Sequence, residues 1–266
     1  MIEYTLQGGD EGANRLDILS NTLQSSTENF LKTLGIHEGA NCLDLGCGTG
    51  NVTCIIAKII GNRGNVLGLD INEKNIQLAV ESAKTEAIKN VNFKYFDAYL
   101  LREKFVYDVI YSRFLLSHLT NPKTVLQNTL DALKPGGLIL IEDTDFAGHF
   151  SNPKSDDFNL YINLYERLLR TRRADANIGQ KLVWLLNEVG FTEVKFQISQ
   201  PVYISGKGKL MAEITFKAVS ESLVEEGFIT ESEAIRIYSS LVQFRKRGDT
   251  MMSLPRIFQV SAKKAF

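Results

Sequence analysis

Hydrophobic and polar positions between residues 40 and 145 alternate between short apolar runs and longer amphipathic segments. Residues 52–60 follow a glycine turn and predict a helix, and residues 73–88 predict a second one. The apolar face of that second helix is formed by Ile76, Ala79, Val80, Ala83 and Ala87. The strands are predicted at ANCLDLG, NVLGLD, NVNFKYFD, YDVIYS and GLILIED, with a further helix at PKTVLQNTLDALK that ends at KPGG. This alternation predicts a mostly parallel sheet covered by helices on both faces.

The remainder of the chain is less regular. Residues 158–173 and the segment IGQKLVWLLNEVGF predict helices, and FTEVKFQI and PRIFQVSAKK predict the last strands. Between those strands lie two further helical segments, the second starting after Thr230, a good N-cap residue with Glu233 three positions later. We interpret residues 203–252 as a helical insertion between neighbouring edge strands. The chain shows no repeat and no low-complexity linker, which favours a single domain over residues 1–266.

Composition narrows the possible partners. The 30 basic and 31 acidic residues give a net charge of -1, so no overall attraction to nucleic acid or to an anionic membrane is expected. No apolar run approaches the roughly 20 residues needed to cross a bilayer, and the start lacks a signal-peptide pattern. The three cysteines and three histidines form no CxxC or HxxxH pattern, so neither a disulfide framework nor a metal site is expected. A cytoplasmic protein without membrane insertion is the expectation.

The stretch LDLGCGTG at residues 43–50 contains the most informative glycines. A strand that ends in glycines and turns into a helix can bring backbone amides close to a ligand. A phosphate-binding P-loop requires a lysine after its last glycine, but Gly50 is followed by Asn51. In a dinucleotide fingerprint the third glycine would stand one position later than Gly50 does. Asp44 either braces this loop or contacts the cofactor directly.

Acidic residues end the next two predicted strands. Asp70 follows Gly50 by 20 residues, where a carboxylate can accept hydrogen bonds from both ribose hydroxyls of an adenosine. Asp97 can accept one from the adenine amino group, which leaves the backbone of Ala98 for the ring nitrogen. Three acidic groups around the loop leave little to neutralise a pyrophosphate. They suit a ligand that carries a cationic sulfonium and an ammonium group.

These motifs, together with YSRFLLSHL at the fourth predicted strand and LKPGG before the fifth, resemble class I S-adenosylmethionine-dependent methyltransferases. Within that superfamily they look like the ubiquinone/menaquinone-biosynthesis type of small-molecule enzyme. The resemblance is strongest over residues 35–145, the expected cofactor-binding core. It implies S-adenosylmethionine as cofactor and a Rossmann-like, seven-stranded sheet of order 3-2-1-4-5-7-6 with the last strand antiparallel. It also implies that residues 203–252 act as a substrate lid and that residues 1–34 form a helical cover.

The resemblance further implies roles for individual residues. Gly46, Cys47 and Gly48 would line the methionine part, and Asp70 and Ile71 would hold the ribose and flank the adenine. Asp97 and Ala98 would read the adenine edge, while Ser112 and Arg113 would lie under the cofactor. Tyr4 and Arg15 either close over the cofactor or belong to a surface helix. His118 is the candidate catalytic base, with a packing role as the alternative.

The predicted function is methyl transfer to the O, N or C atom of a small molecule. Displacement at a sulfonium rests on alignment, and a base is needed only where the attacking atom starts protonated. A protein or peptide methyltransferase, a non-catalytic S-adenosylmethionine binder and an NAD-binding oxidoreductase are the alternatives. Amino-directed DNA enzymes carry [DNS]PP[YFW] where this chain has SRFLL, and the PC dipeptide of cytosine-C5 enzymes is absent. No nucleic-acid partner is therefore expected, and a homodimer is compatible with the sequence.

Overall fold

The computed structural model describes residues 10–266 and is built around one seven-stranded sheet. The strand order is β3-β2-β1-β4-β5-β10-β7. Strands β1 to β5 are parallel, whereas β10 runs antiparallel to both β5 and β7. The order and the antiparallel last strand predicted from the sequence are confirmed. The strands are β1 (Asn41–Leu45), β2 (Asn65–Asp70), β3 (Val91–Tyr95), β4 (Tyr107–Arg113), β5 (Leu133–Asp145), β7 (Thr192–Ser199) and β10 (Arg256–Lys263).

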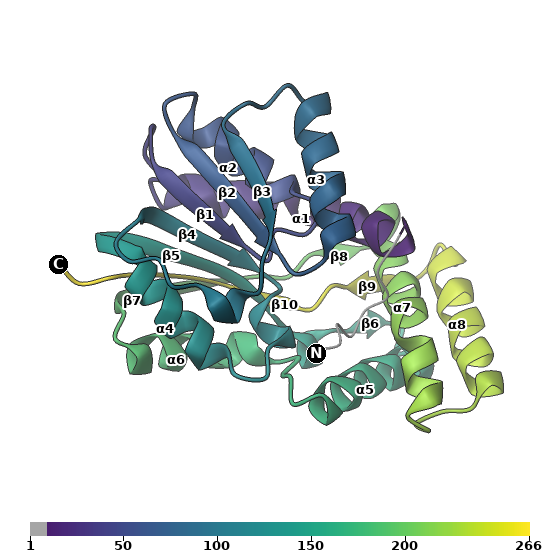
Figure 1. Ribbon diagram of the computed structural model, residues 1–266. Coiled ribbons are helices and arrows are strands. Elements are labelled where there is room, and N and C mark those ends of the chain that lie inside the picture. The colour runs from purple at the N-terminus through teal and green to yellow at the C-terminus, as the bar shows by residue number, and fades with distance from the viewer. Residues whose placement is uncertain (1–9) are drawn as a thin grey trace.

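Helices cover both faces of the sheet, with α1, α2 and α3 on one side and α4 and α6 on the other (Figure 1). Strand side chains alternate between these layers, as a period of two requires. Leu43 and Ile110 pack in the cluster with α4 and α6, whereas Cys42 and Val109 pack with α1 and α2. The helices are α1 (Asp10–Thr33), α2 (Asn51–Ile60), α3 (Glu73–Thr85), α4 (Pro122–Ala132) and α6 (Leu182–Val189).

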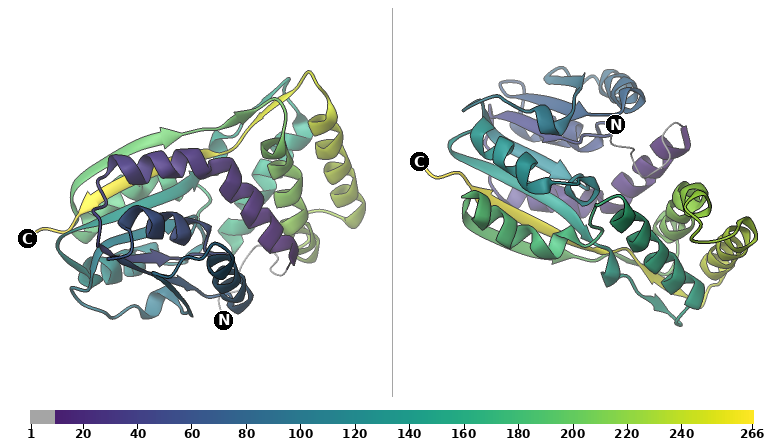
Figure 2. Two further views of the ribbon diagram at one scale, coloured as in Figure 1. Left: turned by 90° about the horizontal axis from the view of Figure 1, so that it is seen from above. Right: turned by 60° about the horizontal axis from the view of Figure 1, so that its bottom comes forward.

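Three more helices, α5 (Asp156–Thr171), α7 (Met211–Glu225) and α8 (Glu231–Lys246), pack together beside the sheet. They lie on the side of the molecule away from the C-terminus in Figures 1 and 2. Their shared core includes Phe158, Phe216 and Leu241. Helix α8 begins with the predicted capping box, in which the Thr230 hydroxyl accepts from the amide of Glu233 and the Glu233 side chain accepts from the amide of Thr230.

The predicted helical insertion lies between β7 and β10, which pair directly. Its ends form a small sheet that the sequence pattern did not predict. The order in this sheet is β6-β9-β8, from β6 (Ser151–Asn152), β8 (Val202–Tyr203) and β9 (Met251–Ser253). Strand β9 joins the insertion to β6, and β6 follows β5. The insertion is thereby attached to the carboxyl end of β5.

One predicted helix is shorter in the structure than in the sequence analysis. Helix α3 ends at Thr85 rather than at residue 88, and Ala87 lies outside it with a positive φ of 55°. The chain turns there so that the amide of Ile88 donates to the carbonyl of Ala83. The prediction of Ala87 on the apolar helix face was therefore wrong, while Ile76, Ala79 and Ala83 are buried as expected.

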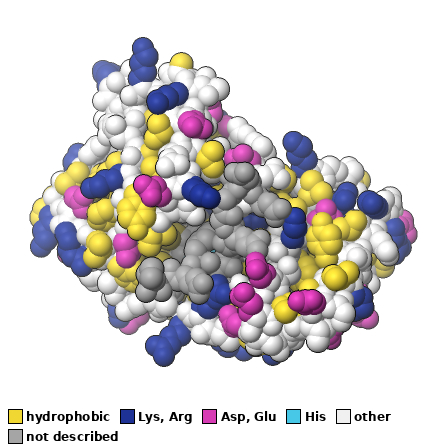
Figure 3. All heavy atoms as spheres, turned by 45° about the vertical axis from the view of Figure 1, so that its right-hand side comes forward, with side chains coloured by type: hydrophobic (Ala, Val, Ile, Leu, Met, Phe, Trp, Pro, Cys, Tyr) yellow, Lys and Arg dark blue, Asp and Glu magenta, His cyan; other side chains and the backbone are white. Residues whose placement is uncertain are grey.

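The surface carries charges of both signs. Figure 3 shows Lys and Arg side chains interspersed with Asp and Glu on one face of the molecule, between hydrophobic side chains. Within residues 10–266, none of the helices combines the length and the apolar character needed to span a bilayer.

Candidate active site

The glycine loop between β1 and α2 is a bare stretch of backbone. Gly46 and Gly48 have φ values of 80° and 54°, a region that L side chains rarely adopt. The amides of Gly46 and Cys47 donate to the carbonyl of Leu69 at 2.8 and 2.9 Å, which fixes the loop over the end of β2. A Cβ at Gly46 would lie 3.2 Å from the Leu115 side chain. The loop therefore lines a cavity with backbone rather than with side chains.

Asp70 ends β2 directly beneath this loop. One carboxylate oxygen accepts from the amide of Gly48 at 2.9 Å, and the other accepts from the amide of Asn72 at 2.8 Å. The side chain of Asn75 also donates to this carboxylate, which has about four acceptor positions in all, so a position stays open for a ligand hydroxyl. Burial raises the pKa of Asp70, and the two amides partly offset that effect. The carboxylate of Asp70 can therefore still accept a hydrogen bond from a ribose hydroxyl, as predicted.

Asp44 lies in β1 and is 2% exposed. Its carboxylate accepts from the hydroxyl of Thr53 at 2.6 Å, a bond between β1 and α2. Burial raises the pKa of Asp44 to about 6, although the Thr53 hydrogen bond and the positive charge of Arg113 oppose the rise. Asp44 braces the loop through Thr53 and also lines the cavity. The two alternatives drawn from the sequence are therefore compatible with each other.

The predicted adenine end lies farther along the same sheet edge. Asp97 caps the 3-10 helix η1 (Ala98–Leu100) by accepting from the amide of Tyr99 at 2.9 Å. Ala98 and Ile71 also line the cavity, and Ile71 is 41% exposed. A half-exposed apolar side chain beside a carboxylate suits one face and one edge of a purine ring.

Helix α1 brings Arg15 to the cavity. The helix is joined to the glycine loop region by Asp17, which accepts from the side chain of Asn51 at 3.0 Å. Arg15 is 7% exposed, and its buried Nε has no hydrogen-bond partner among the residues that the structure describes. A buried donor without an acceptor is costly, so the Nε of Arg15 points to an acceptor group of a bound ligand.

Arg113 and Ser112 end β4 and differ in their surroundings. Arg113 lines the cavity and donates to the hydroxyls of Thr27 and Ser20 on α1, at 3.2 and 3.3 Å. Ser112 is buried and donates to the carbonyl of Leu45 at 2.9 Å, and it is not among the cavity-lining residues. The structure thus brings Arg113 to the cavity but gives Ser112 a contact within the sheet.

His118 lies on the 3-10 helix η2 (Leu116–His118), immediately after β4. Asp143 of β5 holds this turn, because its carboxylate accepts from the amide of Ser117 at 3.2 Å. Burial lowers the pKa of His118 to about 4, and the nearby charge of Arg15 acts in the same direction. The imidazole is therefore neutral near pH 7 and lines the cavity in a form that can accept a proton.

The far end of the cavity is aromatic and comes from distant segments. The Phe146 ring stacks on the Tyr165 ring with centroids 4.0 Å apart, and the Tyr161 ring meets Phe146 edge-on at 5.7 Å. His149 and residues of the insertion complete this end, which is continuous with the glycine loop. The lining residues that the sequence analysis did not assign include Asn72, Phe96, Leu115, Thr144, His149, Lys209, Met211, Ala212, Thr215, Met252 and Leu254.

Three remaining expectations concern single groups. Tyr4 lies outside the described residues. Burial raises the pKa of Cys47 well above its ordinary value, so the thiol stays protonated, and Cys47 lines the cavity beside the glycines. Across residues 10–266, no cluster of three or more His, Cys, Asp or Glu side chains has an arrangement that could hold a metal ion.

A seven-stranded sheet with an antiparallel last strand, carrying a glycine loop and acidic strand ends at one edge, defines a class I methyltransferase. The chain belongs to the methyltransferase-domain family, which matches residues 36–198. It is therefore an S-adenosylmethionine-dependent enzyme of that superfamily and resembles the ubiquinone/menaquinone-biosynthesis group, as the sequence analysis predicted.

Individual relatives agree with this assignment. Demethylmenaquinone methyltransferase of Lactococcus lactis is 36% identical over 181 residues, which cover 63% of this chain and 71% of that protein. The chain spans about half the length of other curated relatives that it matches.

Two solved structures share the fold. A Bacillus halodurans protein superposes with a TM-score of 0.62 at 18% identity, over 91% of this chain and all of that one. Phosphoethanolamine N-methyltransferase 2 of Haemonchus contortus, in complex with S-adenosylhomocysteine, has a TM-score of 0.60 at 18% identity, over 97% of this chain and 58% of that one.

Proposed function

We propose that this enzyme transfers the methyl group of S-adenosylmethionine to a small planar aromatic acceptor that carries a hydroxyl group, as in quinone biosynthesis. The observation that supports this most directly is the single cavity in which the glycine loop and the aromatic wall of Phe146, Tyr161 and Tyr165 are continuous. Flat rings suit an aromatic acceptor because offset and edge-on contacts between rings are favourable. The name of the Lactococcus relative agrees with an acceptor of this class.

The residues of the cavity fit the cofactor. The backbone of Gly46 and Gly48 leaves room for its methionine part, and the carboxylates of Asp44 and Asp70 complement a positive sulfonium and ammonium. The guanidinium of Arg15, which has an unpaired buried Nε, complements a carboxylate. When bound, S-adenosylmethionine supplies an electrophilic methyl group on a good leaving group. We assign Asp70 with Ile71 to the ribose, Asp97 with Ala98 to the adenine, and Arg113 to the electrostatic support of Asp44.

The protein's own contribution is alignment and proton removal. The acceptor lies between the aromatic wall and the glycine loop, and the insertion over residues 203–252 closes the acceptor end with Met211, Ala212 and Thr215. Closure by apolar groups excludes water and strengthens the electrostatic contacts inside. His118 lines the cavity directly after β4 and takes the proton that the acceptor loses as the bond between acceptor and methyl group forms.

Transfer of a labelled methyl group tests this proposal. Purified protein is incubated with tritiated S-adenosylmethionine and, in separate reactions, with reduced 1,4-naphthoquinone, phosphoethanolamine, sarcosine or a peptide library. We expect label in the naphthohydroquinone only. Label confined to one of the amines or to peptides would replace the proposed acceptor class. No transfer to any of them, in a protein that binds the cofactor, would contradict the proposed reaction with these acceptors and favour a non-catalytic binder.

A further inference from the structure

The imidazole of His149 is held in one tautomer, in which Nε2 is a hydrogen-bond acceptor. It follows the 3-10 helix η3 (Phe146–Gly148), and its Nδ1 lies 2.7 Å from the carbonyl oxygen of Phe146. A carbonyl oxygen only accepts, so Nδ1 carries the hydrogen. Burial lowers the pKa of this imidazole to about 4, which keeps it neutral near pH 7. A neutral imidazole protonated at Nδ1 has a lone pair at Nε2, so that nitrogen can only accept a hydrogen bond.

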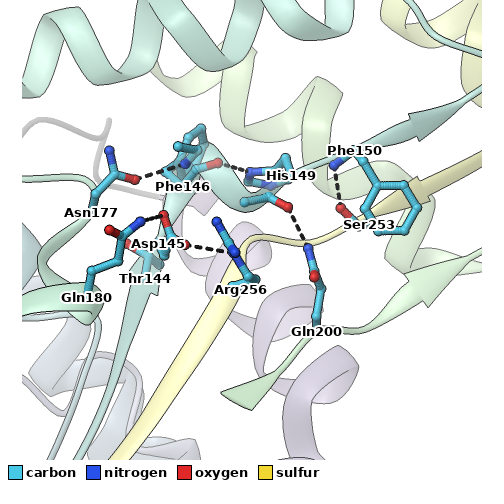
Figure 4. Close-up of polar contacts among 12 residues, drawn as sticks. Thr144, Asp145, Phe146, His149, Phe150, Asn177, Gln180, Gln200, Ser253 and Arg256 are labelled. Atoms are coloured by element: carbon cyan, nitrogen blue, oxygen red, sulfur yellow. Dashed lines mark hydrogen bonds and ion pairs between the residues drawn. The ribbon is translucent and has the colours of Figure 1, made fainter.

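The turn that carries His149 is held from several elements at once (Figure 4). The side chain of Asn177 accepts from the amide of Ala147 at 2.9 Å, and Gln200 donates to the carbonyl of Gly148 at 2.6 Å. On either side of the turn, the hydroxyl of Ser253 accepts from the amide of Phe150 at 2.7 Å, and Asp145 pairs with Arg256 at 2.7 Å.

These contacts come from three segments far apart in the sequence: the region before η4 (Ile178–Lys181), the residue after β7, and the stretch from the end of β9 to the start of β10. Support from several elements fixes the direction of the side chain that the turn carries, as a group that binds a ligand requires. A Cβ at Gly148 would come within 2.3 Å of the Arg256 side chain, so the turn also lies close against β10.

The ring itself lies among aromatic neighbours. Its centroid is 4.4 Å from that of Phe146 and 6.4 Å from that of Tyr161, both edge-on, and all three residues line the main cavity. His149 also borders a second pocket with Asn159 and Asn163. Within residues 10–266, no hydrogen bond joins Nε2 to a protein donor, so this acceptor in an aromatic wall is available to a ligand.

We propose that His149 recognises the acceptor by accepting a hydrogen bond from its aromatic hydroxyl at Nε2, and so selects phenols over rings without a donor. This inference rests on the proposed function and adds a residue that determines specificity. His118 and His149 then have separate tasks in one cavity. His118 stands beside Arg15 at the cofactor side, whereas His149 stands in the aromatic wall.

Binding of a matched pair of aromatic probes tests the proposal without turnover. The protein is saturated with S-adenosylhomocysteine and titrated calorimetrically with 1-naphthol and with 1-methoxynaphthalene, which differ in the hydrogen-bond donor. We expect wild-type protein to bind 1-naphthol about tenfold more tightly, since an unpaired polar group at a buried site costs roughly that factor. His149→Phe keeps a ring but removes the acceptor, and we expect the ratio of the two affinities to fall to about 1.

Two further variants complete the design. His149→Gln places an amide oxygen near the position of Nε2 and is expected to restore part of the preference for 1-naphthol. His37→Gln alters an exposed histidine outside the cavity and is expected to leave the ratio unchanged. A ratio near 1 in the wild type, or an undiminished ratio in His149→Phe with unchanged S-adenosylhomocysteine binding, overturns the role of His149. Failure of wild-type protein to bind either probe contradicts the aromatic acceptor class itself.

Discussion

The two ends of the cavity are built in different ways. At the cofactor end, the ligand faces the bare backbone of the glycine loop and carboxylates at the ends of adjacent strands, within residues 44–98, with Arg15 of α1 added from outside this range. At the acceptor end, the walls come from α1, the turn after β5, helix α5 and the insertion, which are up to about two hundred residues apart. The first end is encoded in local motifs, whereas the second exists only when distant segments pack.

This difference predicts where the enzyme tolerates change. The cofactor end depends on a few atoms whose positions are fixed by the sheet, so single substitutions there should act on cofactor affinity alone. The acceptor end depends on a core shared by α5, α7 and α8. A substitution that weakens the packing of this core should therefore also change the shape of the acceptor end. A substitution at one end should therefore leave ligand binding at the other end largely unchanged.

Phe216→Ala removes a fully buried ring of α7 whose centroid lies 6.2 Å from that of Tyr161. We expect the free energy of unfolding to fall by about 3–5 kcal/mol, measured by urea denaturation, because a large cavity is left in the core. Binding of 1-naphthol should be lost, with a much smaller change in the affinity for S-adenosylhomocysteine. The control is Ile235→Ala on α8, where the side chain is 68% exposed and about 0.5 kcal/mol at most is expected. Loss of cofactor affinity before loss of acceptor binding would contradict the separation of the two ends.

His118→Gln tests the residue proposed to remove the proton of the acceptor during methyl transfer. We expect kcat to fall about 100-fold, the lower end of the usual contribution of a positioned base, with no change in the dissociation constant of S-adenosylhomocysteine. Single-turnover methyl transfer measures the first quantity and calorimetry the second. An unaltered kcat would assign His118 to packing.

Asp70→Ala tests the cofactor end alone. The carboxylate anchors the amides of Gly48 and Asn72, so the substitution removes a ribose partner and loosens the loop. We expect the dissociation constant of S-adenosylmethionine to rise about 100-fold, as hydrogen bonds to a charged group are worth roughly 1.5–3 kcal/mol. Asp131→Ala, an exposed carboxylate on α4, serves as the matched control. Equal affinities in the wild type and Asp70→Ala would place the ribose elsewhere.

The pH dependence of cofactor binding tests Asp44. Burial raises the pKa of this carboxyl to about 6, so it is mostly ionised at pH 7 and mostly neutral at pH 5. The ionised form favours the positive sulfonium but not the neutral thioether of S-adenosylhomocysteine. The preference for S-adenosylmethionine over S-adenosylhomocysteine should therefore fall about tenfold between pH 7 and pH 5.

A second carboxyl, Asp143, has its pKa raised to about 6 by burial and titrates in the same window. It holds the turn before His118 and does not distinguish the two ligands by charge. Asp44→Asn should consequently abolish the pH dependence of the preference. A preference that still falls with pH in this variant would assign the effect to another group.

The two ends also differ in how far the sequence predicts them. The residues of the cofactor end directly follow or end predicted apolar strands in the sequence: Gly46, Gly48, Asp70 and Asp97. Because the carboxyl ends of parallel strands lie at one edge of a sheet, the convergence of these residues can be predicted. The aromatic wall has no such signal. Tyr161 and Tyr165 occur in a segment whose helical pattern is equally typical of a buried core, and Phe146 follows a strand without a motif around it. The small sheet was missed because β6 and β8 have two residues each and obtain their partners only from β9.

Single contacts explain the remaining differences. The turn at Ala87 depends on a positive φ that the helical pattern of residues 73–88 does not reveal. Ser112 was expected under the cofactor, whereas its hydroxyl donates to the carbonyl of Leu45 in the neighbouring strand. His149 is one of three histidines in the chain, and its position after β5 was the one signal that pointed to the sheet edge. Its tautomer and its lack of a partner at Nε2 are tertiary properties.

We expect the glycine loop and its acidic neighbours to bind S-adenosylmethionine rather than a dinucleotide. Calorimetric titration of wild-type protein with S-adenosylmethionine and, separately, with NAD tests it most directly. We expect one bound S-adenosylmethionine per chain with a dissociation constant in the micromolar range or below, and no measurable binding of NAD. Absence of S-adenosylmethionine binding at millimolar concentration, or tighter binding of NAD, would contradict it.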